Sequence, residues 1–138
     1  MTLNWFKFAS PATFYPLAGR LTRPFWILTG VLLVIGLYWG FFQTPDQLGG
    51  NNAQKEYYRI IFIHVPAAWM SMWLYIVMVC WAAIGLVFNT RLSFMMANAV
   101  APTGAVFTFL ALWTGAFWGR PSWGTYWDWD PRLTSELV

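Results

Sequence analysis

The stretch from residue 60 to residue 88 reads IIFIHVPAAWMSMWLYIVMVCWAAIGLVF, and its only titratable side chains are those of His64, Tyr75 and Cys80. It runs for 29 residues without an Asp, Glu, Lys or Arg. An α-helix rises about 1.5 Å per residue, so about 20 apolar residues cover a hydrocarbon core of about 30 Å. The stretch is therefore long enough to cross a membrane as a helix, with a tilt or a bend near Pro66 taking up the extra length.

Two further uncharged stretches flank this one, at 25–42 and 99–118, and they contain 18 and 20 residues. Each matches the length of one membrane crossing. Backbone groups inside a bilayer must be hydrogen-bonded within the protein, and apolar runs of this length achieve that as helices rather than as barrel strands. The sequence therefore predicts an all-α integral membrane protein with three transmembrane helices, at 25–42, 60–88 and 99–118.

The composition supports the membrane class and excludes several others. Of the 138 residues, 59% are hydrophobic and 9% are charged, whereas an ordinary soluble domain has about 25% charged residues. The formal net charge is +3, but the eight basic residues are scattered. They form no stripe of the kind that nucleic acid requires, so we predict no nucleic-acid partner.

The flanks of the first predicted helix favour a cytoplasmic N-terminus. Lys7, Arg20 and Arg23 precede that helix, and no basic residue follows it until Lys55. Over the whole chain, four basic residues fall on each side of the predicted spans, so the totals do not decide the orientation. Cytoplasmic flanks are enriched in Lys and Arg, and the flanks of the first helix usually dominate. The predicted segments outside the helices are a cytoplasmic or interfacial segment at 1–24, an outer loop at 43–59, a cytoplasmic turn at 89–98 and an outer Trp-rich segment at 119–138.

This topology brings the only histidine close to the Trp-rich segment. The start of the second helix and the end of the third lie on the same side of the membrane, whichever side that is. His64 therefore lies one to two turns below the interface at which residues 118–130 emerge. We expect His64 and the densest aromatic cluster of the chain to be neighbours in depth.

That cluster, from Trp118 to Arg132, reads WGRPSWGTYWDWDPR. One or two tryptophans at a helix end commonly anchor a chain at the lipid headgroups, but here the aromatic residues continue past the predicted helix end. The alternative is a flat, π-rich platform for a large planar ligand such as a porphyrin, although a quinone or a lipid headgroup matches part of it. The residues predicted for the platform are Trp118, Trp123, Tyr126, Trp127 and Trp129, with Arg120 and Arg132 available for acidic groups of the ligand.

His64 has two interpretations. An ionisable side chain inside a span is costly unless it is paired, and it marks a functional site by default. A neutral imidazole is a common axial ligand of haem iron, although a structural histidine bonded to a neighbouring helix stays possible. The residues at i+3, i+4 and i+7 are Ala67, Ala68 and Ser71, and this small-residue face favours either the edge of a macrocycle or close helix packing.

At these residues the chain resembles the haem exporter protein C family of cytochrome c maturation. Residues 58–68 resemble the approach to the first outer histidine of that family, and residues 102–109 resemble its third span. Residues 118–138 are similar to its tryptophan-rich WWD signature. The W-G-x-x-W-x-W-D core of that signature corresponds to Trp123, Gly124, Trp127, Trp129 and Asp130.

The resemblance implies a multi-pass protein of the bacterial inner membrane that handles haem b transiently, with the Trp-rich segment in the periplasm. His64 would be an axial ligand of the haem iron, and the WWD core, including Gly124 and Asp130, would cradle the haem edge. The partners implied are a periplasmic haem chaperone, ATP-binding-cassette exporter subunits and a small single-span subunit. Because the family has six spans and a second axial histidine in a later outer loop, the chain is expected to be the N-terminal half of such a protein.

Two other classes stay open. A membrane haem lyase shares the tryptophan signature but is much longer. A quinone-binding or structural anchor subunit of a respiratory complex would show no haem absorbance when purified with its partners. The sequence contains no nucleophile–base pair, no metal-ligand cluster and no Gly-rich phosphate loop, which favours a transport or assembly factor over an enzyme.

Overall fold

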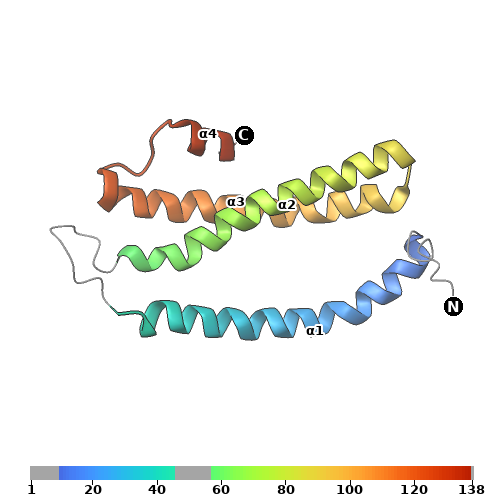
Figure 1. The fold of residues 1–138 in the computed structure, drawn as a ribbon, viewed down its shortest axis with the longest axis horizontal. Coiled ribbons are helices and arrows are strands. Elements are labelled where there is room, and N and C mark those ends of the chain that lie inside the picture. The colour runs from blue at the N-terminus through green and yellow to red at the C-terminus, as the bar shows by residue number, and fades with distance from the viewer. Residues whose placement is uncertain (1–9, 46–56, 138) are drawn as a thin grey trace.

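The computed structural model describes residues 10–45 and 57–137, and within these ranges the chain is helical, with no strand (Figure 1). Helix α1 spans Pro11–Tyr38 and continues as the π-helical turn η2, Trp39–Gln43. The 3-10 turn η3, Tyr57–Ile60, leads into α2, Ile61–Phe88. Helix α3 spans Arg91–Trp123, and the short α4 spans Pro131–Leu137.

Three of the described helical segments, Pro11–Gln43, Tyr57–Phe88 and Arg91–Trp123, are long and apolar enough to cross a membrane. This confirms the all-α, three-span fold class. The first and third helices begin earlier than the apolar stretches at 25–42 and 99–118, because hydropathy does not mark where a helix begins. The ends of α2 and α3 are marked by Asn89, with φ of 51°, and Gly124, with φ of 83°, both in the left-handed region that ends helices.

The first helix begins well before residue 25, at Pro11, and contains Pro16 and Pro24. A proline inside a helix removes one backbone hydrogen bond and clashes with the carbonyl four residues earlier, so it bends the helix. Figure 1 shows α1 bending toward its N-terminal, blue end. Residues 11–24 are thus continuous with the first spanning helix, and residues 1–9 of the predicted N-terminal segment lie outside the described residues.

Helices α2 and α3 form an antiparallel hairpin joined at Asn89 and Thr90. The residues buried in the two helices are almost all small. In lipid, helices associate by close packing and hydrogen bonding, and small side chains let the two backbones approach. The buried residues are Ala67, Ser71 and Gly85 of α2 and Leu92, Ser93, Ala97, Ala111, Thr114 and Gly119 of α3.

Helix α1 is attached to this hairpin through its C-terminal end, and none of its own residues is buried. Phe62 of α2 packs on Gly40 so closely that a Cβ atom at Gly40 would lie 2.8 Å from Phe62 Cγ. The Arg59 guanidinium donates hydrogen bonds to the carbonyl oxygens of Phe41 and Thr44. The start of α2 is therefore tied to the end of α1.

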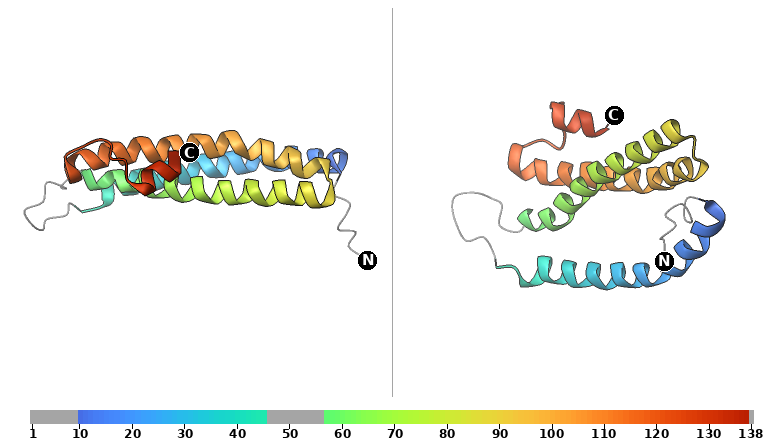
Figure 2. Two further views of the ribbon diagram at one scale, coloured as in Figure 1. Left: turned by 90° about the horizontal axis from the view of Figure 1, so that it is seen from above. Right: turned by 45° about the vertical axis from the view of Figure 1, so that its right-hand side comes forward.

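The end of α1, the start of α2 and the end of α3 lie together at one end of the molecule, and the start of α1 and the turn between α2 and α3 lie at the other (Figure 1). Helix α4 does not continue away from this bundle. It turns back and lies over the hairpin, as the view from above shows (Figure 2). The Trp-rich segment therefore begins beside the start of α2 and returns along the hairpin.

Candidate functional site

His64 lies near the start of α2 and is hydrogen-bonded to α3. Its Nδ1 atom is 3.1 Å from the carbonyl oxygen of Ala111 and 3.1 Å from the hydroxyl oxygen of Thr114. A carbonyl oxygen can only accept, so Nδ1 carries the proton. The Thr114 hydroxyl donates its own hydrogen to the carbonyl of Leu110 at 2.6 Å, which leaves its oxygen able to accept from His64.

This arrangement determines the tautomer of His64. A neutral imidazole that is protonated at Nδ1 has its lone pair at Nε2. Within the described part of the chain, every hydrogen bond of His64 is made through Nδ1. Metal-ligating histidines commonly donate the other ring N–H to a carbonyl, which fixes both tautomer and ring orientation. The hydrogen bond to a neighbouring helix and the capacity to bind a metal are thus compatible properties of His64.

The imidazole packs between Gly115 and Trp118 of α3. A Cβ atom at Gly115 would lie 3.0 Å from His64 Cε1, so only glycine leaves room for the ring in this position. The ring centroids of His64 and Trp118 are 5.8 Å apart. The expectation that His64 and the aromatic cluster are neighbours in depth is confirmed.

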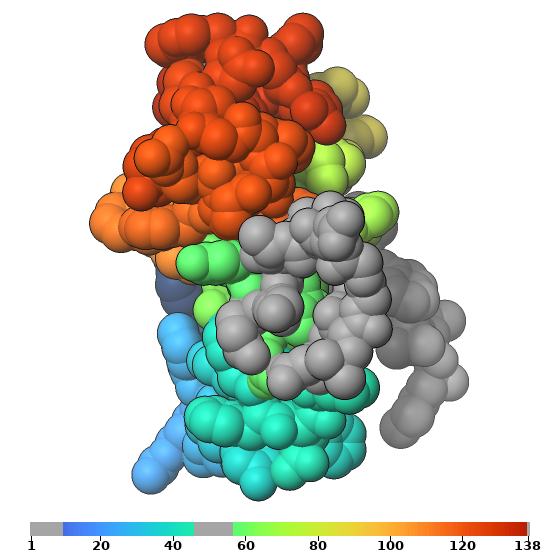
Figure 3. Space-filling model, turned by 90° about the vertical axis from the view of Figure 1, so that its left-hand side faces the viewer, coloured from blue at the N-terminus to red at the C-terminus, as the bar shows by residue number. Residues whose placement is uncertain are grey.

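A cavity of about 440 Å³ opens beside Trp118 at this end of the molecule. Its volume is within the range of small-molecule sites, about 300–1,000 Å³. Figure 3 views this end, with the end of α3 and the Trp-rich segment (orange to red) on one side, the end of α1 (teal) on the other, and the start of α2 (green) between them. The lining residues are four aromatic ones, one aliphatic and one cationic: Phe41, Tyr57, Phe117, Trp118, Ile60 and Arg59.

Of the residues that line this cavity, only Trp118 was predicted as a site residue, although one pattern in the sequence indicates more of them. Tyr57, Ile60 and His64 are spaced by three and four residues, which places them on one face of the helical chain. Two of the three line the cavity, and the third contacts Trp118 on its wall. The contributions of Phe41 and Phe117 depend on how three helices meet, and no local pattern indicated them.

Glycines shape the first part of the Trp-rich segment. Gly124 ends α3, and its N–H donates to the carbonyl oxygen of Arg120 at 3.0 Å. Gly119 is buried, and a Cβ atom there would lie 3.2 Å from the Thr125 carbonyl oxygen and 3.2 Å from the Trp123 ring. Gly124 therefore lets the chain turn, and Gly119 lets it fold back onto the end of α3.

The tryptophans differ in how they are placed. Trp123 and Trp129 are 61% and 73% exposed, so much of each indole surface is open to a partner or to lipid. The indole N–H groups of Trp118 and Trp127 are buried and have no hydrogen-bond partner in the described part of the chain. Because buried donors are nearly always paired in native proteins, both groups are candidates for hydrogen bonds to an acceptor outside the described residues.

The two arginines predicted for acidic groups of the ligand are engaged with the Trp-rich segment itself. Arg120 donates to the Gly124 carbonyl oxygen, and its guanidinium carbon lies 5.3 Å from the centre of the Tyr126 ring. Arg132 forms an ion pair with Asp130. Of the described arginines, Arg59 is the one that lines the cavity.

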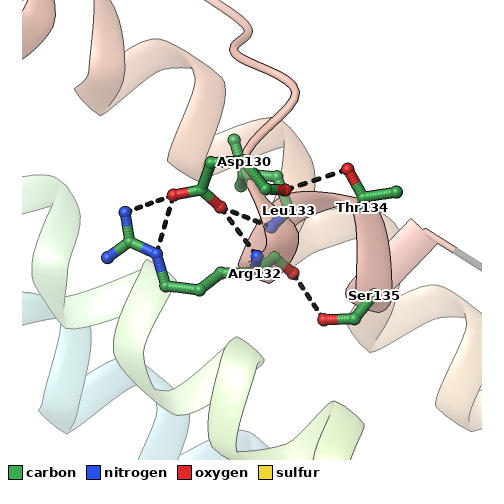
Figure 4. A network of polar contacts seen from close by, with 5 residues as sticks. All are labelled: Asp130, Arg132, Leu133, Thr134 and Ser135. Atoms are coloured by element: carbon green, nitrogen blue, oxygen red, sulfur yellow. Dashed lines mark hydrogen bonds and ion pairs between the residues drawn. The ribbon is translucent and has the colours of Figure 1, made fainter.

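Asp130 caps the N-terminus of α4 (Figure 4). Its Oδ1 atom accepts from the backbone N–H groups of Arg132 at 2.7 Å and Leu133 at 3.0 Å, as an N-cap side chain does. Its Oδ2 atom accepts from Arg132 Nε at 2.8 Å. The Arg132 side chain, followed by the Leu133 N–H, holds the pKa of Asp130 below its ordinary value, and Asp130 in turn raises the pKa of Arg132.

The chain matches the family model described as "Heme exporter protein C" over residues 4–138. Curated proteins of that name are similar to it along nearly all of its length. The protein from Escherichia coli (strain K12) is 47% identical over 133 residues, which cover 96% of this chain and 52% of the relative. The protein from Haemophilus influenzae is 44% identical over 132 residues, which cover 95% and 52%. The protein from Rhodobacter capsulatus is 40% identical over 138 residues, which cover 99% and 54%.

The chain thus spans about half the length of the curated relatives that it matches. The match nevertheless includes all three spanning helices, His64 and the whole Trp-rich segment. On this evidence, the chain belongs to the haem exporter protein C family.

Proposed function

We propose that the protein binds haem at the His64 end of the bundle and passes it on for the biogenesis of c-type cytochromes. The observation that carries this proposal is the placement of His64, whose Nδ1 is fixed by α3 while Nε2 makes no hydrogen bond within the described residues. No three His, Cys, Asp or Glu side chains of the described residues are grouped as a metal site. Iron held in a macrocycle needs only axial ligands from the protein, and one histidine can supply such a ligand.

The surroundings of His64 have the chemistry that a haem edge requires. Trp118 joins the imidazole to the aromatic cavity, because it contacts the His64 ring and also forms part of the cavity wall. The aromatic lining suits a planar apolar macrocycle. The Arg59 guanidinium on the cavity wall and the indole N–H of Trp118, which has no hydrogen-bond partner among the described residues, suit carboxylate groups at the edge of the macrocycle. Haem is here the cargo of the protein.

We further propose that this end of the protein faces the periplasm of a bacterium and that the N-terminus is cytoplasmic. The three basic residues before the uncharged part of α1 support this orientation. Family membership supports delivery of haem to a periplasmic haem chaperone, in company with ATP-binding-cassette exporter subunits and a small single-span subunit. The name "Heme exporter protein C" of the relatives supports transport rather than catalysis.

The proposed ligand role is tested by three changes at the site, measured on the protein in its membrane. His64→Ala is expected to shift the haem spectrum toward a high-spin form or to remove haem, because alanine has no lone pair to donate. Added imidazole is expected to restore part of the parent spectrum. Thr114→Val is the control: it removes one acceptor of Nδ1, keeps the Ala111 carbonyl, and is expected to change the spectrum much less.

His64→Gln separates the ligand from the structural interpretation. A glutamine amide can donate to the Ala111 carbonyl but is a poor haem ligand. If the Gln variant has the parent spectrum while the Ala variant does not, His64 is a structural residue and the proposal is wrong. Parent haem content in both His64 variants would equally contradict it and would favour the quinone or anchor alternative.

A further inference from the structure

Ser71 of α2 is hydrogen-bonded to a carboxylate that comes from the far end of the chain. Its side chain is buried, with 4% exposure, and its hydroxyl donates to Oε1 of Glu136 in α4. The Ala68 carbonyl oxygen, one turn earlier in α2, is a second acceptor at 2.8 Å, so the one hydroxyl proton is shared between the two acceptors. An acidic side chain beside an apolar span is costly unless it is paired, so this contact needs an explanation beyond packing.

The contact is on the same face of α2 as His64. Seven residues separate Ser71 from His64, which is close to two helical turns and about 10 Å along the axis. On α3, Gly119 lies one turn beyond Gly115, which contacts the His64 ring, toward the end of the bundle where the cavity opens. Along the bundle axis, His64 therefore lies between Gly119, where the Trp-rich segment folds back, and Ser71, where it is bound again.

Helix α4 depends on such anchors. It has seven residues, and isolated helices shorter than about 12–15 residues are marginal in water. Pro131, Arg132, Ser135 and Leu137 are exposed, so packing covers only part of its surface. The Asp130 cap determines where α4 begins, and the Glu136–Ser71 hydrogen bond attaches its last turn to α2.

We propose that Ser71 and Glu136 are positioning residues of the haem site. Their hydrogen bond latches α4 to α2, and the latch holds residues 124–130, with Trp127 and Trp129, beside the His64 end of the bundle. Neither residue touches the ligand. The haem part of this inference rests on the proposed function, whereas the latch itself is measured without haem.

The haem-free test uses a cysteine at Leu133, which is half-buried in α4, in a Cys80→Ala background. Ser71→Ala is expected to raise the rate at which a membrane-impermeant maleimide labels this cysteine by at least about fivefold, since a hydrogen bond to a charged group is lost. Ser93→Ala is the matched control, because Ser93 is equally buried but is bonded to Thr90 at the opposite end of the hairpin. Equal labelling rates in the Ser71 and Ser93 variants would overturn the latch.

The haem test uses Glu136. Glu136→Ala is expected to lower haem affinity about tenfold, and Glu136→Gln to lower it less, because the amide oxygen can still accept from Ser71. The double variant with Ser71→Ala is expected to be no weaker than the single Glu136→Ala variant, since both remove one interaction. If the losses of haem affinity in the two single variants add in the double variant, the two residues do not act through one interaction. If Ser71→Ala speeds labelling but leaves haem affinity unchanged, the latch does not position the haem site. A parent protein without haem would contradict the proposed function and leave the labelling result to decide the latch.

Discussion

Substituting Gly115 by alanine is expected to move the His64 ring and lower haem affinity while changing the stability of the helix bundle little. A Cβ atom at this position would lie 3.0 Å from His64 Cε1 and 3.5 Å from Nδ1. Ordinary van der Waals contacts begin at about 3.5 Å, so the ring must move by roughly half an ångström. The two contacts of Nδ1 are 3.1 Å long, near the outer limit of an N–H···O hydrogen bond, and this movement breaks or weakens them.

The expected magnitudes differ for stability and for haem binding. Loss of one net hydrogen bond costs about 0.5–1.5 kcal/mol, which is roughly a 2- to 13-fold change in an equilibrium constant. Alanine in a helix interior is more favourable than glycine by about 0.5–1 kcal/mol. We therefore expect the free energy of unfolding of Gly115→Ala to change by less than about 1 kcal/mol. Haem affinity is expected to fall by roughly 2- to 10-fold, with an altered spectrum.

Gly104→Ala provides the matched control on the same helix. Its added Cβ atom would lie 3.8 Å from Leu74 Cβ, an ordinary contact, so it gains helix propensity without moving a neighbour. Haem titration and thermal unfolding of both variants in the same detergent are the measurements. If Gly115→Ala and Gly104→Ala bind haem with the same affinity and spectrum, the His64 ring is not held against α3 and the reasoning is refuted.

Three other predictions concern the attachment of α1, the cap of α4 and the orientation of the protein in the membrane. Gly40→Ala is expected to loosen the attachment of α1 by about 1–3 kcal/mol through overpacking, measured by unfolding in detergent, whereas Gly36→Ala, with nothing within 4 Å, is not. Asp130→Ala is expected to release α4, and Asp130→Asn to retain the cap. Because the pKa of Asp130 is lowered, its stabilisation of α4 is complete above the ordinary pKa range of Asp and is lost only as the pH falls through the lowered pKa. Tryptophan fluorescence can follow this loss. Cysteines at Thr125 and Ser10, in a cysteine-free background, are expected to react with an impermeant label outside and inside respectively; the reverse pattern would invert the proposed orientation.

The sequence alone determined the fold class and the number and order of the spanning helices. Length and hydropathy of a span are local properties, because a bilayer accepts only about 20 apolar residues per crossing whatever else the protein contains. Three such spans alternate in direction, so the start of the second helix, with His64, lies on the same side of the membrane as the end of the third. Helix ends were less predictable, since they depend on the residue that stops the helix, such as Asn89 or Gly124, rather than on hydropathy.

The tertiary structure decided which groups the site residues contact. His64 Nδ1 contacts Ala111 and Thr114, 47 and 50 residues away, and Ser71 contacts Glu136, 65 residues away. Both depend on how each helix is rotated about its axis, which periodicity does not specify when every face is apolar. The cationic residue at the cavity is Arg59, which packing places between the end of α1 and the start of α2, whereas Arg120 and Arg132 are bonded to acceptors in their own segment. The sequence shows that Arg120 and Arg132 are close to the tryptophans along the chain. Only the packing of the helices determines which arginine lines the cavity.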